Sequence, residues 1–86
     1  MGLGATGNLS VVEARADALF VSPLQRSDQP SAATVDRAIA AAVKAFGCRG
    51  CAGLVAQEFG EHPETAVTRM RWVRAKICEC FGAPTS

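Results

Sequence analysis

A chain of 86 residues is long enough for one domain with a small hydrophobic core. With 49% hydrophobic and 20% charged residues, it is too apolar to be intrinsically disordered, yet it has no apolar run long enough to predict a transmembrane helix. The net charge of +1 gives the molecule almost no field to attract a polyanion, and most nucleic-acid-binding domains are more basic. Alanine-rich segments without β-branched runs predict an all-α fold.

The N-terminal segment is predicted to be a flexible tail followed by a short helix. Residues 1–8 contain three glycines and no hydrophobic periodicity, which indicates a tail. They lack the basic start and apolar core of a signal peptide, and the Ala-rich, Lys-poor composition looks bacterial, so we expect a cytoplasmic protein. Ser10 and Glu13 match a capping box, which predicts an amphipathic helix over 11–20.

A loop over 21–30 separates this helix from the rest of the chain. It contains two prolines, two serines and an aspartate, which are typical of an irregular connection. We therefore divide the chain into an N-terminal arm over 9–30, a main helical unit over 31–81 and a tail over 82–86.

The first helix of the main unit is expected over 32–46. Ser31 can cap its start, and Gly47 can end it. Its apolar positions form a continuous stripe that is expected to face the core: Val35, Ala38, Ile39, Ala42, Val43 and Phe46.

The next two helices, over 51–59 and 63–80, are expected to meet at a tight corner. Gly60 can adopt the left-handed conformation that ends a helix, and Pro63 fits the first turn of the following one. Ala56 is expected to be small because the third helix crosses close above it. In that helix the core stripe is predicted to be Ala66, Met70, Val73 and Ile77.

Several positions within 51–76 follow a helix-turn-helix pattern. They are Ala56, Gly60, Thr65-Ala66, Arg69-Met70 and Arg74. The pattern resembles the helix-turn-helix of bacterial sigma-factor region 4 and of related small actinobacterial-type regulators, from which it departs at Glu61 and Pro63. The resemblance implies a three-helix DNA-binding unit with an additional N-terminal helix, in a protein that binds double-stranded DNA and regulates transcription.

If helix 63–80 is the recognition helix, the outward side chains of its first turns would meet base edges. Arg71 would be the strongest reader of guanine, whereas Thr65 and Arg69 would hold phosphates or the fold itself. A homodimer formed through the N-terminal helix would double the DNA site. The predicted DNA-binding residues are His62, Glu64, Thr65, Thr68, Arg69, Arg71 and Arg74.

The alternative hypothesis is an all-helical interaction or adaptor module, which the low net charge favours. Trp72 lies off the apolar stripe of its helix, so either the N-terminal arm covers it or it anchors a partner. Together with Leu19 and Phe20 of the N-terminal helix, Trp72 would then form the partner surface.

The four cysteines, Cys48, Cys51, Cys78 and Cys80, do not suggest a metal site. Cys78 and Cys80 would point in nearly opposite directions on a helix, so they could not share an ion. Cys48 and Cys51 at a helix N-terminus would have a lowered thiol pKa, which allows a redox-responsive regulator as a further alternative. The single histidine has no catalytic partners, so we expect neither an enzyme nor a cofactor.

Overall fold

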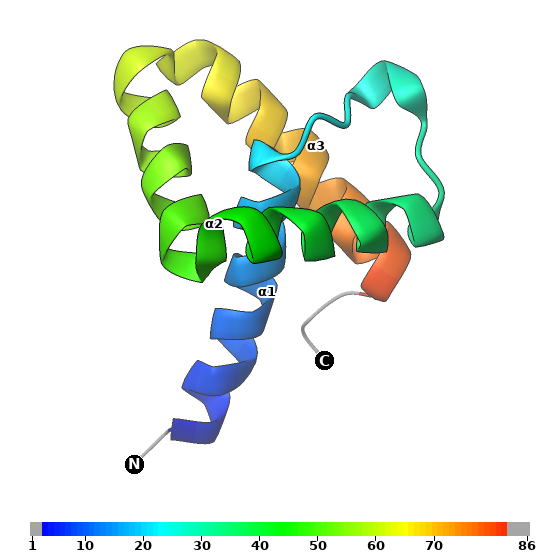
Figure 1. Ribbon diagram of the computed structural model, residues 1–86, viewed down its shortest axis with the longest axis vertical. Helices are drawn as coiled ribbons and strands as arrows, with labels where there is room; N and C mark the ends of the chain where they lie inside the picture. Colours follow the sequence, from blue (N-terminus) through cyan, green and yellow to red (C-terminus); the bar gives the residue numbers. More distant parts are fainter. Residues whose placement is uncertain (1–2, 83–86) are drawn as a thin grey trace.

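The computed structural model describes the backbone of residues 3–82 and the side chains of residues 11–82. Its elements are α1 (Leu3–Val21), the 3-10 turn η1 (Arg26–Asp28), α2 (Ala32–Glu61) and α3 (Pro63–Phe81) (Figure 1). No strand occurs within residues 3–82, and the predicted all-α fold is confirmed.

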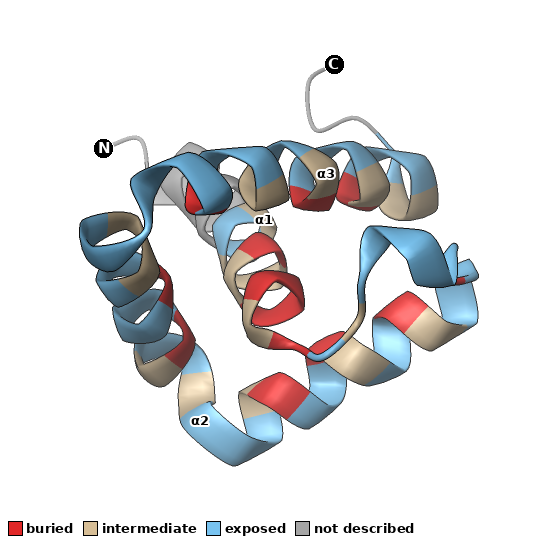
Figure 2. Ribbon diagram, turned by 90° about the horizontal axis from the view of Figure 1, so that it is seen from above, coloured by how far each residue is buried: buried red, intermediate tan, exposed pale blue. Residues whose placement is uncertain are grey.

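Helix α1 forms the centre of the fold. The two arms of α2 and helix α3 surround its C-terminal half, which is coloured as mostly buried in Figure 2. Ala16, Ala18, Leu19 and Phe20 are all buried there. Helix α1 therefore belongs to the same core as the rest of the chain, because it supplies the surface on which both other helices pack.

Helix α1 is also longer than predicted, since it begins at Leu3. The prediction of a tail over 1–8 and of a helix start capped by Ser10 is corrected accordingly, while residues 1–2 and 83–86 of the two predicted tails lie outside the described residues. Gly4 and Gly7 have low helix propensity and interrupt the apolar pattern, which explains why this part of the helix left no periodic signal.

Helix α2 consists of two arms, 32–46 and 48–61, that meet at Gly47. This glycine has φ 74° and ψ 165°, which is the only non-helical conformation inside α2. Ser31 caps the first arm, because its side chain accepts a hydrogen bond from the Thr34 N–H at 3.2 Å. The predicted cap and the predicted helix end at Gly47 are both confirmed.

By length and composition alone, α2 could also cross a membrane. In the fold, however, the break at Gly47 divides this helix, and both arms turn apolar side chains towards the core. These are Val35, Ile39, Ala42, Cys51 and Val55. Because core helices of folded domains pass the same test, length and composition alone do not assign a membrane span to α2.

Helix α3 covers α1 from the other side. Its predicted core stripe is confirmed, since Ala66, Val73 and Ile77 are buried and Met70 packs half-buried against them. Pro63 stands in the first helical turn, where its missing N–H leaves no hydrogen bond unmade.

Asp17 on α1 makes the stability of this core depend on pH. Burial raises the pKa of its carboxyl above the ordinary value of 3.8, Glu13 raises it further, and Arg74 partly opposes both. The folded chain therefore binds the Asp17 proton more tightly than the unfolded chain does. As the pH rises from 3.8 through the raised pKa of the folded chain, Asp17 ionises and the free energy of unfolding falls.

We expect Asp17→Asn to raise the melting temperature at neutral pH, because the amide removes a half-buried charge. The difference from the wild-type chain should disappear below pH 3.8, where both side chains are neutral. Thermal unfolding across this pH range is the measurement, with exposed Asp36→Asn as the control. A stability gain of equal size at every pH would contradict the assignment to this proton.

Candidate functional site

The corner between α2 and α3 lies at His62, two residues after the predicted hinge. Gly60 lies inside α2 in a helical conformation, and positive φ angles among the described glycines occur only at Gly47 and Gly82. His62 has φ −137° and ψ 65°, and its N–H donates to the Glu58 carbonyl at 2.7 Å. The left-handed hinge predicted at Gly60 is therefore wrong.

Ala56 does not lie beneath α3. It is exposed, whereas the neighbouring Val55 faces the core. The predicted close crossing above Ala56 is wrong, because the buried side of the second α2 arm passes through Cys51 and Val55 instead. Two positions on which the helix-turn-helix pattern rested thus have other roles here, although two helices do meet at a corner.

Arg69 holds the end of α1. Its Nε donates to the Phe20 carbonyl at 2.8 Å, and one terminal nitrogen donates to the carbonyls of Ser22 and Leu24, both at 2.9 Å, and of Leu19 at 3.4 Å. The last carbonyls of a helix have no partner within the helix and favour a cation. Arg69 therefore holds the fold, which is one of the two roles predicted for it, and these bonds leave it little freedom to hold a phosphate.

The guanidinium of Arg69 is also enclosed by aromatic rings. It lies 5.6 Å from the centre of the Phe20 ring and 5.5 Å from that of Trp72, distances at which a cation attracts an aromatic face. The burial that this creates lowers the pKa of Arg69 below its ordinary value. The carbonyl oxygens and the two rings together replace the water that the charge loses.

The remaining arginines predicted to contact DNA differ in their surroundings. Arg74 makes an exposed ion pair with Glu13 of α1 at 3.2 Å, whereas Arg71 is exposed and forms no salt bridge with any side chain of residues 11–82. Exposed ion pairs are weak, so Arg74 is still available to an anion at small cost. Of the predicted cationic contacts, Arg71 is the one left fully open to solvent.

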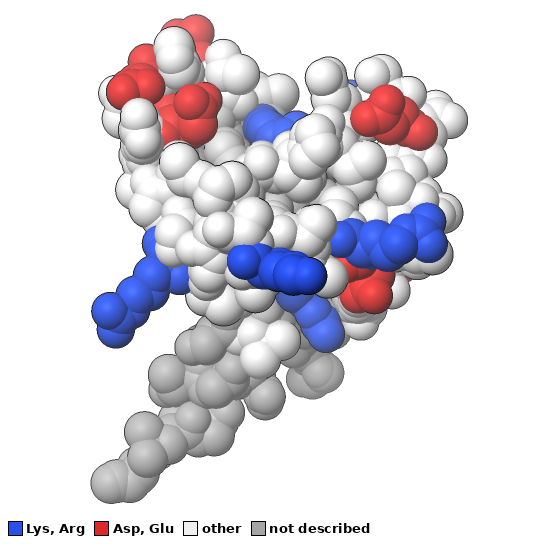
Figure 3. Space-filling model, viewed as in Figure 1, with Lys and Arg blue, Asp and Glu red and all other residues white. Residues whose placement is uncertain are grey.

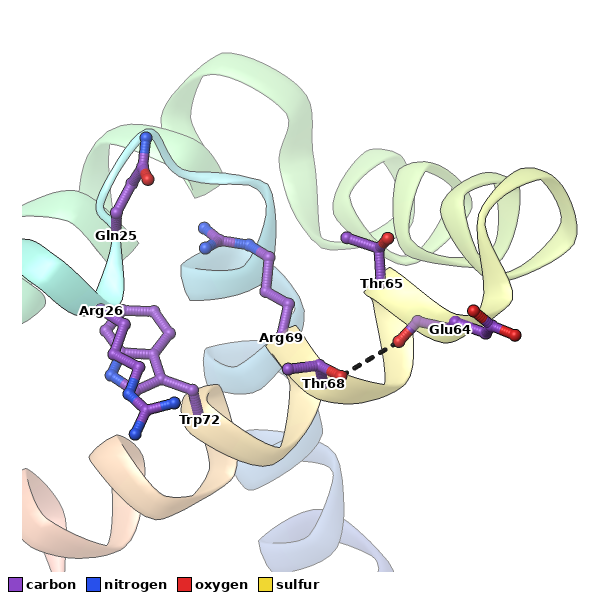
Figure 4. Close-up of a pocket in the computed structure, with 7 residues that line it drawn as sticks. All are labelled: Gln25, Arg26, Glu64, Thr65, Thr68, Arg69 and Trp72. Carbon is purple, nitrogen blue, oxygen red and sulfur yellow. Dashed lines mark hydrogen bonds between the residues drawn. The ribbon is translucent and has the colours of Figure 1, made fainter.

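The first turns of α3 border a pocket of about 470 Å³ beside the loop that holds η1 (Figure 4). Glu64, Thr65, Thr68, Arg69 and Trp72 line it from α3. Thr68 donates its hydroxyl to the Glu64 carbonyl at 3.1 Å, so this hydroxyl is already used within the helix. On the far side the loop contributes Gln25 and Arg26 (Figure 4).

Acidic side chains surround the leading end of α3. Glu58, Glu61 and Glu64 fall within seven positions of the chain at this corner, together with exposed His62. Figure 3 shows one group of acidic side chains at the corner between α2 and α3, with other acidic side chains on the opposite side of this face and basic side chains across its middle. A phosphate backbone approaching the first turn of α3 would meet like charge.

An apolar groove of about 400 Å³ runs between the first arm of α2 and the chain that leaves α1; we call it the α2 groove. Small side chains on α2 leave room along its floor, and the α1 end forms the opposite wall. The side chains that matter below are Val21, Leu24, Ala38, Ala41, Ala45 and Phe46.

Phe46 is the most prominent apolar side chain of the α2 groove. It is 51% exposed, so its predicted place in the core stripe is wrong. The buried positions of this arm end at Ala42, and the chain changes direction at Gly47, so Phe46 extends beyond the surface that α1 covers. Leu54, 37% exposed, lies in a second hollow of about 320 Å³, which shares Val21 with the α2 groove.

The α2 groove has a basic edge. Arg37 lines it directly, and Lys44 stands seven residues further along the same arm. A spacing of seven residues places two side chains on the same side of a helix, two turns apart. Both are exposed, and neither forms a salt bridge within residues 11–82.

The predicted interface residues do not form one surface. Leu19 and Phe20 are buried in the core with exposed fractions of 0% and 5%, so their prediction as a partner surface is wrong. Trp72 is half-buried against the core, and its open side faces the pocket beside η1. The sequence could have indicated the α2 groove only through the alanines on one side of helix 32–46.

The cysteine pair does not have the expected properties of a redox centre. Cys51 is buried, and its thiol lies 3.7 Å from the Ala42 carbonyl as a weak donor. Burial, followed by the neighbouring Cys48, raises the pKa of the Cys51 thiol, which is opposite to the predicted direction. Cys48 is exposed, and both thiols are free.

Comparisons with known proteins give no further guide to the site. No protein-family model, curated protein or solved structure matches this chain.

Proposed function

We propose that this protein is a small all-α interaction module that binds an amphipathic helix of a partner protein in the α2 groove. The observation that carries the proposal is the half-exposed Phe46 in an apolar groove with a floor of alanines. An aromatic side chain left open to water costs free energy that a partner recovers by covering it. Helix-in-groove recognition uses this kind of surface.

The chemistry of the partner follows from the edge of the groove. Arg37 and Lys44 form a row of positive charge along one side, so the partner helix has an apolar face flanked by Asp or Glu. Opposite charges across such an edge set the orientation of the helix and speed its association. The small side chains of Ala38, Ala41 and Ala45 let the partner backbone approach closely.

The experiment compares two synthetic helical peptides by fluorescence anisotropy. Both carry the same leucine face, and one is flanked by glutamates, the other by lysines. We expect the glutamate-flanked peptide to bind more tightly, and Phe46→Asp to weaken it by about tenfold or more. Val67→Asp is the matched control, because Val67 is an exposed apolar side chain of α3 outside the groove.

Two outcomes would overturn this proposal. Equal affinity for both peptides would mean that Arg37 and Lys44 do not select an acidic partner. Equal loss of affinity in Phe46→Asp and Val67→Asp would mean that the peptide adsorbs nonspecifically to apolar surface. Phe46 is half-exposed, so Phe46→Asp is expected to fold, and thermal unfolding checks this directly.

Double-stranded DNA is the second candidate partner. Arg71, Thr68 and His62 are exposed on or beside the leading turns of α3, as a reading helix requires. The acidic corner and the use of Arg69 within the fold count against it. A duplex titration at low salt decides: binding that falls steeply with salt and weakens in Arg71→Ala would establish DNA as the partner.

A further inference from the structure

Three side chains at the corner between α2 and α3 bring metal-binding atoms together. A carboxylate oxygen of Glu58, one of Glu61 and an imidazole nitrogen of His62 all lie within 4.8 Å of one another. Nothing in the proposed interaction of the α2 groove uses these residues. We infer that this corner binds a divalent transition-metal ion, with Zn²⁺ as the representative ion, through Glu58, Glu61 and His62.

The backbone holds the three ligands in place. Glu58 and Glu61 stand three residues apart in the last turn of α2, which places them on the same side of the helix. His62 closes this turn through its N–H bond to the Glu58 carbonyl at 2.7 Å. Pro63 restricts the backbone of the residue before it, so His62 stays out of the helical conformation.

The charges at the corner also favour a cation. Two carboxylates lie close together, and within residues 11–82 neither forms a salt bridge with a lysine or arginine. The Gln57 side-chain amide donates to a Glu61 carboxylate oxygen at 3.3 Å. Ligating carboxylates commonly receive such an outer hydrogen bond, which orients them towards the ion.

The mixed donor set selects the class of metal. Imidazole nitrogen together with carboxylate oxygen suits Zn²⁺ and its neighbours in the transition series, whereas Ca²⁺ and Mg²⁺ prefer oxygen alone. Zinc holds these donors at about 2.0–2.2 Å, so the three atoms must approach one another by roughly an ångström. His62 and Glu61 are exposed and Glu58 is half-exposed, so side-chain rotation can achieve this.

Binding would fix the angle between α2 and α3. The ligands come from the end of one helix and from the residue that begins the next, so an ion joins the two across their only connection. Three protein ligands leave at least one coordination position for water or for a donor from a partner.

The test is a titration of the full chain, freed of metal with a chelator, with Zn²⁺ alone under reducing conditions. His62 is the only histidine, so its ring signals in the NMR spectrum report directly on this site. We expect those signals to shift at one equivalent of Zn²⁺, and calorimetry to show affinity lowered about tenfold or more in His62→Ala and in Glu61→Gln.

Glu64→Gln is the matched control, since Glu64 is an acid at the same corner outside the ligand set, and it should bind as the wild type does. All three variants alter exposed side chains and are expected to fold. Zinc that binds without moving the His62 signals, or equally well in His62→Ala, would be held by the cysteines and would overturn the inference. Absence of any binding would overturn it as well.

Discussion

Arg69→Ala is expected to destabilise the fold by roughly 2–4 kcal/mol, which for a domain of this size lowers the melting temperature on the order of 10–30 °C. The guanidinium donates to four backbone carbonyls where α1 ends, at distances from 2.8 to 3.4 Å. Its removal takes the donor from the carbonyls of Phe20, Ser22 and Leu24, whereas the Leu19 carbonyl still accepts from Ser22. It also opens the space between the Phe20 and Trp72 rings. Chemical or thermal unfolding of the purified chain measures the effect.

Two further variants identify the cause. Arg69→Lys keeps the charge but loses the planar fork that reaches several carbonyls at once, so it should recover only a small part of the stability. Arg71→Ala, on the exposed side of the same helix, should change stability by less than about 0.5 kcal/mol. A melting temperature of Arg69→Ala equal to that of the wild type would contradict this prediction. It would mean that water can hydrogen-bond the carbonyls in place of Arg69, which would then be free to contact a ligand.

Gly47→Ala is expected to cost about 1–3 kcal/mol, because the φ of 74° and ψ of 165° at this position belong to a region that essentially only glycine occupies. No heavy atom lies within 4 Å of the position that a Cβ would take there. The cost is therefore one of backbone conformation and not of collision. Equilibrium unfolding in denaturant measures it.

Gly60→Ala is the matched control for this prediction. Gly60 is helical and exposed, and a Cβ there would also meet no atom within 4 Å. Alanine in a helix is favoured over glycine by roughly 0.5–1 kcal/mol, so this variant should be slightly more stable than the wild type. A helix-turn-helix with its hinge at Gly60 requires the reverse order, and that result would contradict the fold described here.

The local features of this fold could be predicted from the sequence, because they depend on neighbouring residues. Ser31 caps the first arm of α2, Gly47 breaks α2, and Pro63 opens α3, each as its chemistry dictates. The corner was placed wrongly because glycine can remain within a helix. His62 precedes a proline, which disfavours the helical conformation at His62. Pro63 therefore marks the true corner, which lies two residues after the predicted hinge at Gly60.

The parts that could not be predicted depend on residues far apart in the chain. Arg69 contacts carbonyls 45 to 50 positions away, and no local pattern distinguishes such an arginine from one that faces solvent. The α2 groove likewise exists only because the end of α1 lies beside the first arm of α2. Both the Arg69 contacts and the α2 groove depend on the central position of α1. The glycines near the start of α1 interrupt its apolar pattern, so the sequence did not predict its full length.

The distribution of charge separates the two partner classes. A DNA-reading helix needs a positive leading end, whereas α3 begins among Glu58, Glu61 and Glu64, and its Arg69 is turned to the α1 carbonyls. Arg37 instead lines an apolar groove, and Lys44 follows two turns further along the same helical arm. Positive charge beside an apolar surface suits an acidic amphipathic helix better than it suits a duplex.

The most direct test of the account is an NMR titration of isotope-labelled protein, first with the glutamate-flanked peptide and then, in a separate sample at low salt, with duplex DNA. We predict that the peptide shifts the backbone signals of Ala38, Ala41 and Phe46, and that the duplex leaves the signals of α3 in place. Shifts at Thr68 and Arg71 on addition of duplex, with the groove signals unmoved by peptide, would contradict it.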